Sequence, residues 1–288
     1  MSGGGVRSGT SVRDALEGAE TAIAAAGAET PRLDAELLLA HVLGVSRERL
    51  LAERLTADGE LSVQGGAVRA FQNAVRRRSV QREPVAYITG QRGFRRIDLA
   101  IDHRALIPRP ETELLVEVGL GLARGLSVLD VGTGSGAVAL ALKDERPDLE
   151  LSGSDVAEDA LALARENGLR LGLAVRWLHA DLLAGVADEF DAILSNPPYV
   201  EEDRRGELAA EILRHEPAGA LFAGPDGLAV IRALLAQLPE RPRARLVALE
   251  VGAFQADAVM ELVRAAGFQS VSSERDLAGI ERVVVGRR

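Results

Sequence analysis

The chain of 288 residues carries 34 basic and 43 acidic side chains, a formal net charge of −9, and 47% of its residues are hydrophobic. This length and composition are typical of a globular protein with one large α/β domain and a smaller one. The chain has no cysteine, which excludes disulfides, thiolate metal sites and cysteine nucleophiles. Its four histidines lie far apart in the sequence without ligand-like spacing, so we expect no metal ion.

No apolar run approaches the ~20 residues of a membrane helix, so we expect a cytoplasmic protein without membrane contact. Charge is uneven: residues 1–110 carry 16 basic and 13 acidic side chains, whereas 111–288 carry 18 basic and 30 acidic. The densest basic cluster comprises Arg76, Arg77, Arg78, Arg82, Arg92, Arg95 and Arg96. It could bind RNA or an acidic protein, but a solvated helix face is the favoured interpretation.

The first part of the chain is predicted to be helical. Within residues 11–80, apolar positions such as Leu33, Leu37 and Leu38 follow helical spacing, and Thr30-Pro31 supplies an N-cap followed by proline at the first helical position. Residues 1–82 are therefore expected to form a small helical N-terminal domain.

Residues 83–108 are expected to form a β-hairpin linker. Val85–Ile88 and Ile97–Ile101 resemble two strands, and the loop from Thr89 to Gly93 between them contains glycine.

Residues 109–288 alternate between strand and helix patterns. The expected strands are Ser127–Val131, Leu149–Ser154, Ala174–Leu178, Phe190–Ser195 and Arg245–Val251. Two expected helices end near Arg146 and Asn167, and two more span Leu228–Leu238 and Gln255–Ala266. The short runs Gln269–Ser273 and Arg282–Val285 can pair antiparallel at the sheet edge. Such alternation predicts an α/β fold with a mostly parallel, Rossmann-like sheet and helices on both faces.

A glycine-rich loop follows the first of these strands and opens a helix. Its residues Gly132, Thr133, Gly134, Ser135 and Gly136 are candidates for cofactor binding, because glycine lets the backbone turn tightly and approach a ligand. The string also fits the dinucleotide pattern G-x-G-x-x-A with Ala137 in last place, so that alternative stays open.

Two aspartates follow the next two strands. Asp155 is placed to accept the hydroxyls of a ribose, and Asp181 is placed near an adenine edge. For either residue alone, a loop or N-cap carboxylate is the competing interpretation.

Asn196-Pro197-Pro198-Tyr199 follows the fourth strand. Prolines hold Asn196 extended at the end of the strand, where open α/β sheets bind ligands. The Asn196 amide oxygen and the Pro197 carbonyl can accept both N–H groups of a planar NH₂, while Tyr199 supplies a flat face. A rigid turn with a surface tyrosine is the alternative.

This motif favours methyl transfer over hydride transfer. A planar nitrogen has a delocalised lone pair, so its attack on a sulfonium methyl group requires orientation, whereas hydride transfer has no need of such a clamp. S-adenosylmethionine is therefore the expected cofactor.

Asn196–Tyr199 together with Gly132–Gly136 resembles the class I S-adenosylmethionine-dependent N-methyltransferases. Three further stretches resemble the release factor glutamine methyltransferases, namely Glu83–Gly90, Leu106–Glu113 and His215–Leu221. The resemblance runs from about residue 83 to the C-terminus. It implies a seven-stranded methyltransferase domain over residues 109–288, preceded by the helical domain, which would bind the substrate protein.

The resemblance also implies a reaction, which is methylation of the side-chain amide (N5) of glutamine in the Gly-Gly-Gln motif of peptide chain release factors. Gly132–Gly136, Asp155, Asp181 and Leu182 would bind the cofactor with Asn196 beside it. Asn196 and Pro197 would hold the substrate amide, and Pro198 and Tyr199 would complete the pocket. The expected protein is a monomer that needs no nucleic acid. Arg109 and Glu111 are assigned a supporting role near the cofactor or the substrate, and a surface ion pair at a helix start is the alternative.

Two positions depart from the family pattern. Some members carry tryptophan where this chain has Leu182, so aromatic stacking on adenine is not implied and an apolar lid is the alternative. Arg95 and Arg96 stand where relatives often have bulky apolar residues, which suggests a different packing of the hairpin or a different partner contact.

Two other functions compete with this assignment. An N-methyltransferase acting on adenine or guanine amino groups in DNA or RNA would use the same clamp, but the acidic charge of residues 111–288 opposes phosphate. The third hypothesis is a non-catalytic module that retains the fold and binds S-adenosylmethionine or another protein, which the intact Asn196 and Gly132–Gly136 disfavour.

Overall fold

The computed structural model describes residues 10–55 and 62–288 and divides the chain into two compact units. The N-terminal unit contains the chain up to Gly90 together with Ala210–His215. The α/β unit contains Gln91–Ala209 and Glu216–Arg288. The segment expected to be a separate linker, residues 83–108, is thus shared between the two units.

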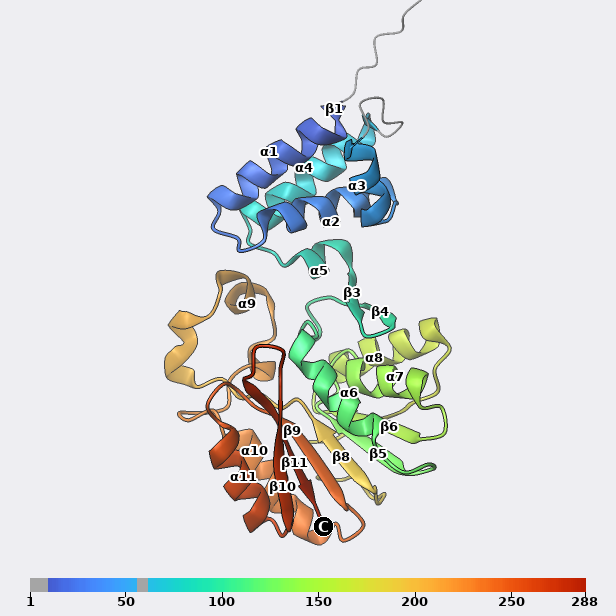
Figure 1. The fold of residues 1–288 in the computed structure, drawn as a ribbon, viewed down its shortest axis with the longest axis vertical. Coiled ribbons are helices and arrows are strands. Elements are labelled where there is room, and N and C mark those ends of the chain that lie inside the picture. The colour runs from blue at the N-terminus through green and yellow to red at the C-terminus, as the bar shows by residue number, and fades with distance from the viewer. Residues whose placement is uncertain (1–9, 56–61) are drawn as a thin grey trace, which may run out of the picture. The chain divides into compact units, whose positions relative to one another are not determined.

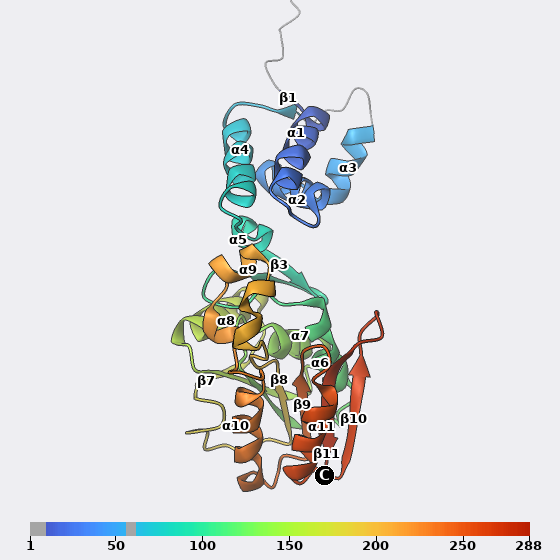
Figure 2. The ribbon, with the colours of Figure 1, turned by 90° about the vertical axis from the view of Figure 1, so that its left-hand side faces the viewer.

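The N-terminal unit is helical, as predicted. Its helices are α1 (Val12–Ala25), α2 (Pro31–Leu43), α3 (Arg47–Leu55), α4 (Gly66–Ser79), α5 (Val85–Thr89) and α9 (Ala210–His215), and a short antiparallel pair joins β1 (Thr10–Ser11) to β2 (Ser62–Val63). The side chains of Ile23, Leu38, Leu39, Leu50 and Phe71 form the centre of its core. Figures 1 and 2 show α1, α2 and α4 packed side by side. Thr30 precedes α2, but its hydroxyl donates to Asp34 at 2.9 Å and makes no cap to a backbone N–H.

The prediction of a strand at Val85–Ile88 is wrong, because these residues form the short helix α5. The Pro84 carbonyl accepts hydrogen bonds from the N–H groups of Tyr87 (3.0 Å) and Ile88 (3.1 Å), and Gly90 ends the helix with φ of +70°. A four-residue apolar run fits a strand and a helix equally well, so the pattern could not decide. The hairpin exists, but it pairs β3 (Gln91–Phe94) with β4 (Ile97–Ala100).

The α/β unit is built on the predicted sheet. Its seven strands are β5 (Ser127–Val131), β6 (Glu150–Asp155), β7 (Arg176–His179), β8 (Ala192–Ser195), β9 (Leu246–Glu250), β10 (Ser270–Arg275) and β11 (Glu281–Arg287), in the spatial order β10-β11-β9-β8-β5-β6-β7. The neighbours from β9 to β7 are parallel, whereas β11 runs antiparallel to both β9 and β10. The mostly parallel sheet and its antiparallel edge are thereby confirmed.

Helices cover both faces of this sheet (Figure 1). The unit contains α6 (Glu113–Leu120), α7 (Ala137–Glu145), α8 (Glu158–Leu171), α10 (Ala229–Gln237), α11 (Ala256–Ala265) and the short 3-10 helices η1 (Pro110–Thr112), η2 (Glu202–Glu207), η3 (Ala218–Ala220) and η4 (Leu238–Glu240). Side chains of β5 alternate between the faces, so Leu129 packs in the core under α10 and α11, and Val128 packs in the core under α6 and α7. In the part of the chain that the structure describes, no helix is long and apolar enough to span a membrane.

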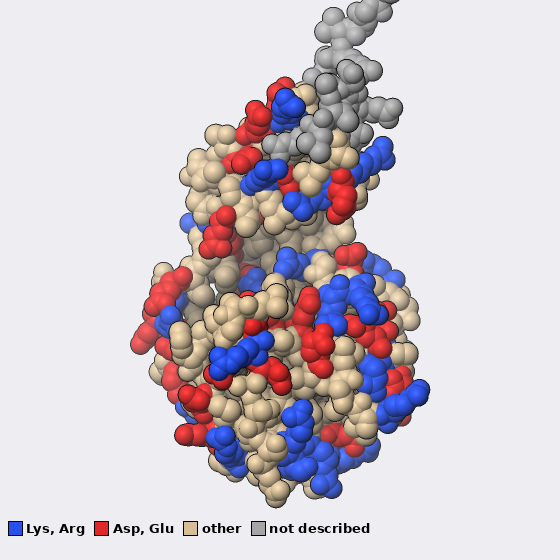
Figure 3. All heavy atoms as spheres, viewed as in Figure 1, with Lys and Arg blue, Asp and Glu red and all other residues tan. Residues whose placement is uncertain are grey.

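Most of the basic cluster is paired within one or other unit, so its interpretation as a solvated helix face is wrong for these arginines. Arg78 is buried and contacts both Asp34 (2.6 Å) and Glu211 (3.1 Å), and Arg82 contacts Glu211 (2.7 Å). Arg77 contacts Glu83, and Arg95 contacts Glu117 and Glu145. On the face shown in Figure 3, basic and acidic side chains are mixed over the described part of each unit.

The hairpin packs through one of its arginines. Arg95 occupies the turn between β3 and β4 with φ of +51°, and its backbone N–H donates to Glu113 at 3.2 Å. Its guanidinium bonds to Glu117 and Glu145, which lie in α6 and α7. Arg95 therefore fastens the hairpin to its own unit, whereas Arg96 is exposed.

Candidate functional site

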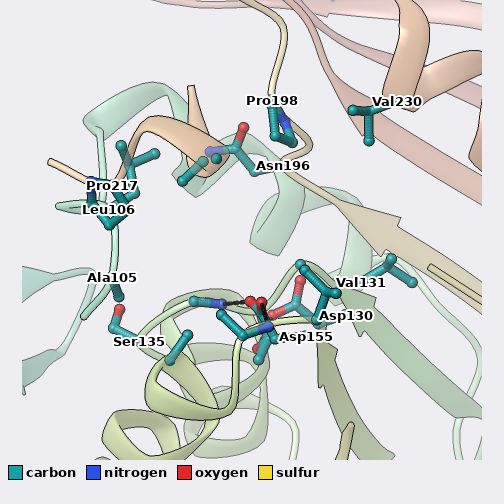
Figure 4. Close-up of a pocket in the computed structure, with 18 of the residues that line it drawn as sticks. Ala105, Leu106, Asp130, Val131, Ser135, Asp155, Asn196, Pro198, Pro217 and Val230 are labelled. Atoms are coloured by element: carbon teal, nitrogen blue, oxygen red, sulfur yellow. Dashed lines mark hydrogen bonds between the residues drawn. The ribbon is translucent and has the colours of Figure 1, made fainter. Parts of the chain in front are cut away.

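A cavity of about 500 Å³ lies at the carboxyl ends of β5, β6 and β8, wholly within the α/β unit (Figure 4). That volume falls within the range of small-molecule sites. The predicted site residues that line it are Gly132, Thr133, Gly134, Ser135, Asp155, Asp181, Leu182, Asn196 and Pro198. Figure 4 shows Asn196 and Pro198 on one side of the cavity and Asp130 and Asp155 on the other.

The glycine loop has the backbone that its sequence suggests. Gly132 and Gly134 adopt φ of +70° and +55°, a left-handed conformation that disfavours side chains with a Cβ. The N–H of Thr133 donates to the Ser154 carbonyl at 2.9 Å, which fastens the loop to the end of β6. The loop therefore presents backbone to the cavity.

Gly136 has a different role from the one predicted, because it does not line the cavity. It caps α7 with φ of +83°, and a Cβ there would lie 2.9 Å from both Leu140 and Trp177. This glycine permits α7 to pack closely against the core. The pattern did not distinguish a glycine that approaches a ligand from one that makes room for packed side chains of the core.

Asp155 ties the loop after β6 to the glycine loop after β5. Its Oδ2 accepts the Gly134 N–H and its Oδ1 accepts the Ala157 N–H, both at 2.9 Å. Each carboxylate oxygen has two lone pairs, so both can accept a further hydroxyl group. Asp155 can therefore position the loop and bind a ribose.

The third loop forms an apolar wall. Leu182 has φ of +55°, an uncommon conformation for leucine, and lies half-buried at the cavity while packing against the core under α10. Asp181 beside it is exposed. The cavity thus offers an aliphatic surface at this position.

Asp130 is a site residue that the sequence reasoning did not assign. It is the penultimate residue of β5 and is buried, and its Oδ2 accepts the Thr133 hydroxyl at 2.6 Å and the Ala139 N–H at 3.3 Å. Burial raises the pKa of this carboxyl to about 7 despite those hydrogen bonds. A buried carboxylate at a cavity wall favours a cationic ligand group, and its place two residues before Gly132 was a usable signal.

Asn196 is held by a residue far away in the sequence. Its Nδ2 donates to the Thr112 hydroxyl at 3.1 Å, and Thr112 is buried at the end of η1. The preceding residue, Ser195, donates its hydroxyl to the Val131 carbonyl at 2.7 Å and so fixes the strand end. With its Nδ2 engaged, Asn196 can offer Oδ1 as an acceptor.

The remaining residues of this motif lie behind the cavity wall. Pro197 is buried and does not line the cavity. Tyr199 donates its hydroxyl to Glu250 at 3.3 Å, and its backbone carbonyl accepts from Gln255 at 3.0 Å. The tyrosine therefore packs into the protein and does not supply the expected flat wall of the cavity.

An ion pair between Arg109 and Glu216 fixes two segments that line another side of the cavity. Glu216 is buried, contacts Arg109 at 2.6 Å and accepts the Ile107 N–H at 3.1 Å. This contact joins the strap that contains Leu106 and Pro108 to the segment that contains Pro217, and Figure 4 shows Leu106 beside Pro217. Arg109 thus has a supporting role in the wall, and its ion-pair partner is Glu216, not Glu111.

Two family models match the chain: the PrmC N-terminal domain over residues 14–90 and the Methyltransferase small domain over residues 110–236. The release factor glutamine methyltransferase of Rhodospirillum rubrum is 42% identical over 268 residues, which cover 91% of this chain and 81% of the relative. That of Deinococcus radiodurans is 40% identical over 285 residues, covering 96% and 98%. The chain belongs to the release factor glutamine methyltransferase family.

As a member of this family, the protein is a methyltransferase that uses S-adenosylmethionine. Its fold is also that of a methyltransferase from Pyrococcus furiosus, which matches with a TM-score of 0.51 at 19% identity over 66% of this chain and 88% of that chain. The fold and the cofactor expected from the sequence are confirmed. The dinucleotide alternative is thereby excluded.

Proposed function

We propose that the protein methylates the side-chain amide nitrogen of the glutamine in the Gly-Gly-Gln motif of peptide chain release factors. The products are N5-methylglutamine and S-adenosylhomocysteine. The observation that carries this proposal is the Asn196 amide, whose Nδ2 is held by Thr112 so that Oδ1 can accept an N–H at the cavity. The names of the relatives support the release factor as substrate.

The lining of the cavity fits S-adenosylmethionine in three places. Asp130 suits the α-ammonium group, Asp155 suits the ribose hydroxyls, and the aliphatic surface around Leu182 suits adenine. When bound there, the cofactor supplies an electrophilic methyl group on a positively charged sulfur. Gly132 and Gly134 allow the loop to approach it without a side chain in the way.

Asn196 would orient the substrate nitrogen through Oδ1, because Pro197 does not line the cavity. The amide lone pair is delocalised, so the nitrogen must be aligned in order to react, and an acceptor for one of its N–H groups contributes to that alignment. An acceptor for these hydrogens also stabilises the positive charge that develops on nitrogen. The nitrogen gains a methyl group and loses one proton.

The N-terminal unit would bind the body of the release factor. We propose that the enzyme works as a monomer in the cytoplasm and needs no nucleic acid. The internal pairing of Arg77, Arg78, Arg82 and Arg95 supports the independence of nucleic acid, because these guanidiniums are already engaged by carboxylates. Methylation of DNA or RNA would require other cations for the phosphates.

The test is transfer of radiolabelled methyl from S-adenosylmethionine to a purified release factor. The parallel samples are a release factor with Gly-Gly-Ala in place of Gly-Gly-Gln, duplex DNA, and RNA. Label only on the unmutated release factor is the expected result. Label on nucleic acid alone would overturn the proposed substrate, and no label on any sample would favour a non-catalytic module.

A further inference from the structure

The carboxyl edge of the sheet in the α/β unit displays apolar side chains to solvent. Among the described residues of this unit, the large apolar side chains that are exposed are those of Val156, Leu169, Phe254 and Leu277. Val156 directly follows β6 and lines the cavity, which assigns it to the cofactor site. Leu169 lies in the last turn of α8, at the opposite edge of the sheet, because this crossover helix runs back from the end of β6. The exposure of Phe254 and Leu277 remains to be explained.

Phe254 lies just beyond the end of β9 and is 97% exposed. The Gln255 N–H donates to the Gly252 carbonyl at 3.2 Å, which closes a tight turn with Phe254 in its third position. Its φ of +71° is a conformation that favours glycine or asparagine there. The Gln255 side chain donates to the Tyr199 carbonyl at 3.0 Å and so fastens this turn to the last residue of the Asn196 motif. A phenylalanine held in solvent in an unfavourable backbone conformation favours the hypothesis of a binding role.

Leu277 is fully exposed in the turn between β10 and β11 (Figure 1). Val283 of β11 lies opposite Glu250, the last residue of β9, so this turn extends beyond the carboxyl edge of the sheet. Asp276 fixes the turn: its Oδ1 accepts two backbone N–H groups of the turn, both at 2.9 Å, and its Oδ2 accepts from Arg282 at 2.9 Å. The turn therefore holds the leucine in solvent on a well-defined backbone.

The proposed function requires the release factor to cover this edge. The amide nitrogen of a glutamine is joined to its Cα through four bonds of about 1.5 Å each, so the two atoms lie at most about 5 Å apart. A glutamine that presents this nitrogen to Asn196 must therefore bring its main chain to the carboxyl end of β8. The turn after β9 and the turn before β11 lie at the same edge, because β9 pairs with both β8 and β11.

We propose that Phe254 and Leu277 are anchors for the release factor, which docks on them through apolar side chains next to the segment that carries the methylated glutamine. The inference rests on the proposed function, because it takes the release factor as the substrate. Hydrogen-bonded turns already hold both side chains, so docking buries apolar area while it orders little additional chain. A second copy of this chain on the same surface would exclude the release factor from Asn196.

The experiment measures the affinity of a purified release factor for the enzyme loaded with S-adenosylhomocysteine, by titration calorimetry. Phe254→Asn and Leu277→Asn should each weaken this affinity about 10-fold, and the double variant about 100-fold, because the two side chains lie in separate turns. Leu169→Asn is the matched control: it removes a leucine of the same unit that is 85% exposed, and it should bind as the wild type does. Phe254→Asn should melt at the wild-type temperature or above it, since asparagine tolerates the positive φ, so weaker binding cannot be loss of folding.

Wild-type affinity in the double variant would overturn the anchoring role, and so would an equal loss in Leu169→Asn. Sedimentation of the enzyme alone tests the second copy: a wild-type dimer that the double variant dissociates would assign these side chains to an interface between copies and overturn the proposal. Failure of the proposed function gives a different result. A wild type that binds the release factor through Phe254 and Leu277 without labelling it would keep the anchors and overturn only the reaction, whereas a wild type that does not bind it would overturn both.

Discussion

The carboxylate of Asp155 accepts a hydrogen bond of 2.9 Å from the backbone N–H of Gly134. The contact joins the end of β6 to the glycine loop after β5. Both oxygens of the Asp155 carboxylate can still accept a ligand hydroxyl in addition to this hydrogen bond. The residue that would bind the ribose therefore also shapes the glycine loop.

Asp155→Ala should weaken S-adenosylmethionine binding by about 10- to 100-fold, because a charged acceptor for the ribose hydroxyls is lost and the glycine loop is released. Titration calorimetry measures the affinity. Asp159→Ala, an exposed aspartate in the first turn of α8, serves as the control and should bind as the wild type does. Unchanged affinity in Asp155→Ala would contradict the ribose assignment.

Asn196→Ala should separate binding from chemistry. Its Nδ2 contacts Thr112 and its other polar atom is assigned to the substrate, so cofactor affinity should be nearly unchanged while kcat falls about 100-fold or more. Calorimetry and the methyl-transfer assay give the two values. An equal loss in both would mean that the side chain binds the cofactor.

Gly136→Ala should destabilise the α/β unit by about 2–4 kcal/mol, because a Cβ would meet Leu140 and Trp177 and the left-handed backbone would be strained. Gly172→Ala is the matched control: it has φ of +68° but no atom within 4 Å of its Cβ, so only about 1 kcal/mol is expected. Urea unfolding can be followed by fluorescence of Trp177, the one tryptophan of the sequence. Equal losses would show that Gly136 matters only for its φ.

The stability of the α/β unit should decrease as pH rises through about 7. Burial raises the pKa of both Asp130 and Glu250 to about 7, so the folded protein binds more protons than the unfolded chain above about pH 4. Their contribution is fully present below the unfolded pKa values and is lost as pH rises through the folded ones. The free energy of unfolding without cofactor, measured by urea at several pH values from about 5.5 to 8.5, should therefore decline.

Asp130→Asn should flatten that decline, because the amide does not titrate. Its slope should be shallower by up to about 1.4 kcal/mol per pH unit where Asp130 titrates. A slope equal to that of the wild type would show that Asp130 has no raised pKa in the folded protein.

Much of the α/β unit could be predicted because the signals are local. Patterns of a few residues indicate strands buried on both faces, crossover helices and loop glycines. The sheet could therefore be predicted from the sequence, together with the places of Gly132, Asp155 and Asn196 at its carboxyl edge. Local signals failed where two structures share one pattern. The apolar run Val85–Ile88 is compatible with a strand and with a helix. In the structure it forms a helix, in which backbone N–H groups donate to the Pro84 carbonyl.

Contacts between distant parts of the chain were beyond such reasoning. Thr112, Glu216 and Glu250 carry no local signature of a site, and they acquire roles because the fold brings them to Asn196, Arg109 and Tyr199. Likewise, Ala210–His215 belongs to the N-terminal unit because Glu211 meets Arg78 and Arg82 there.

The sequence by itself determined the class of fold, the family and the chemical groups that surround the cofactor, since these depend on periodicity and on motifs within single loops. Only the tertiary structure decided which of those groups face the cavity. Gly136 and Tyr199 stand in the same motifs as Gly134 and Asn196, yet close packing directs the first pair into the protein and the second pair to the cavity. The physical reason is that the side-chain environment depends on neighbours across the sheet, which adjacent residues in the sequence do not reveal.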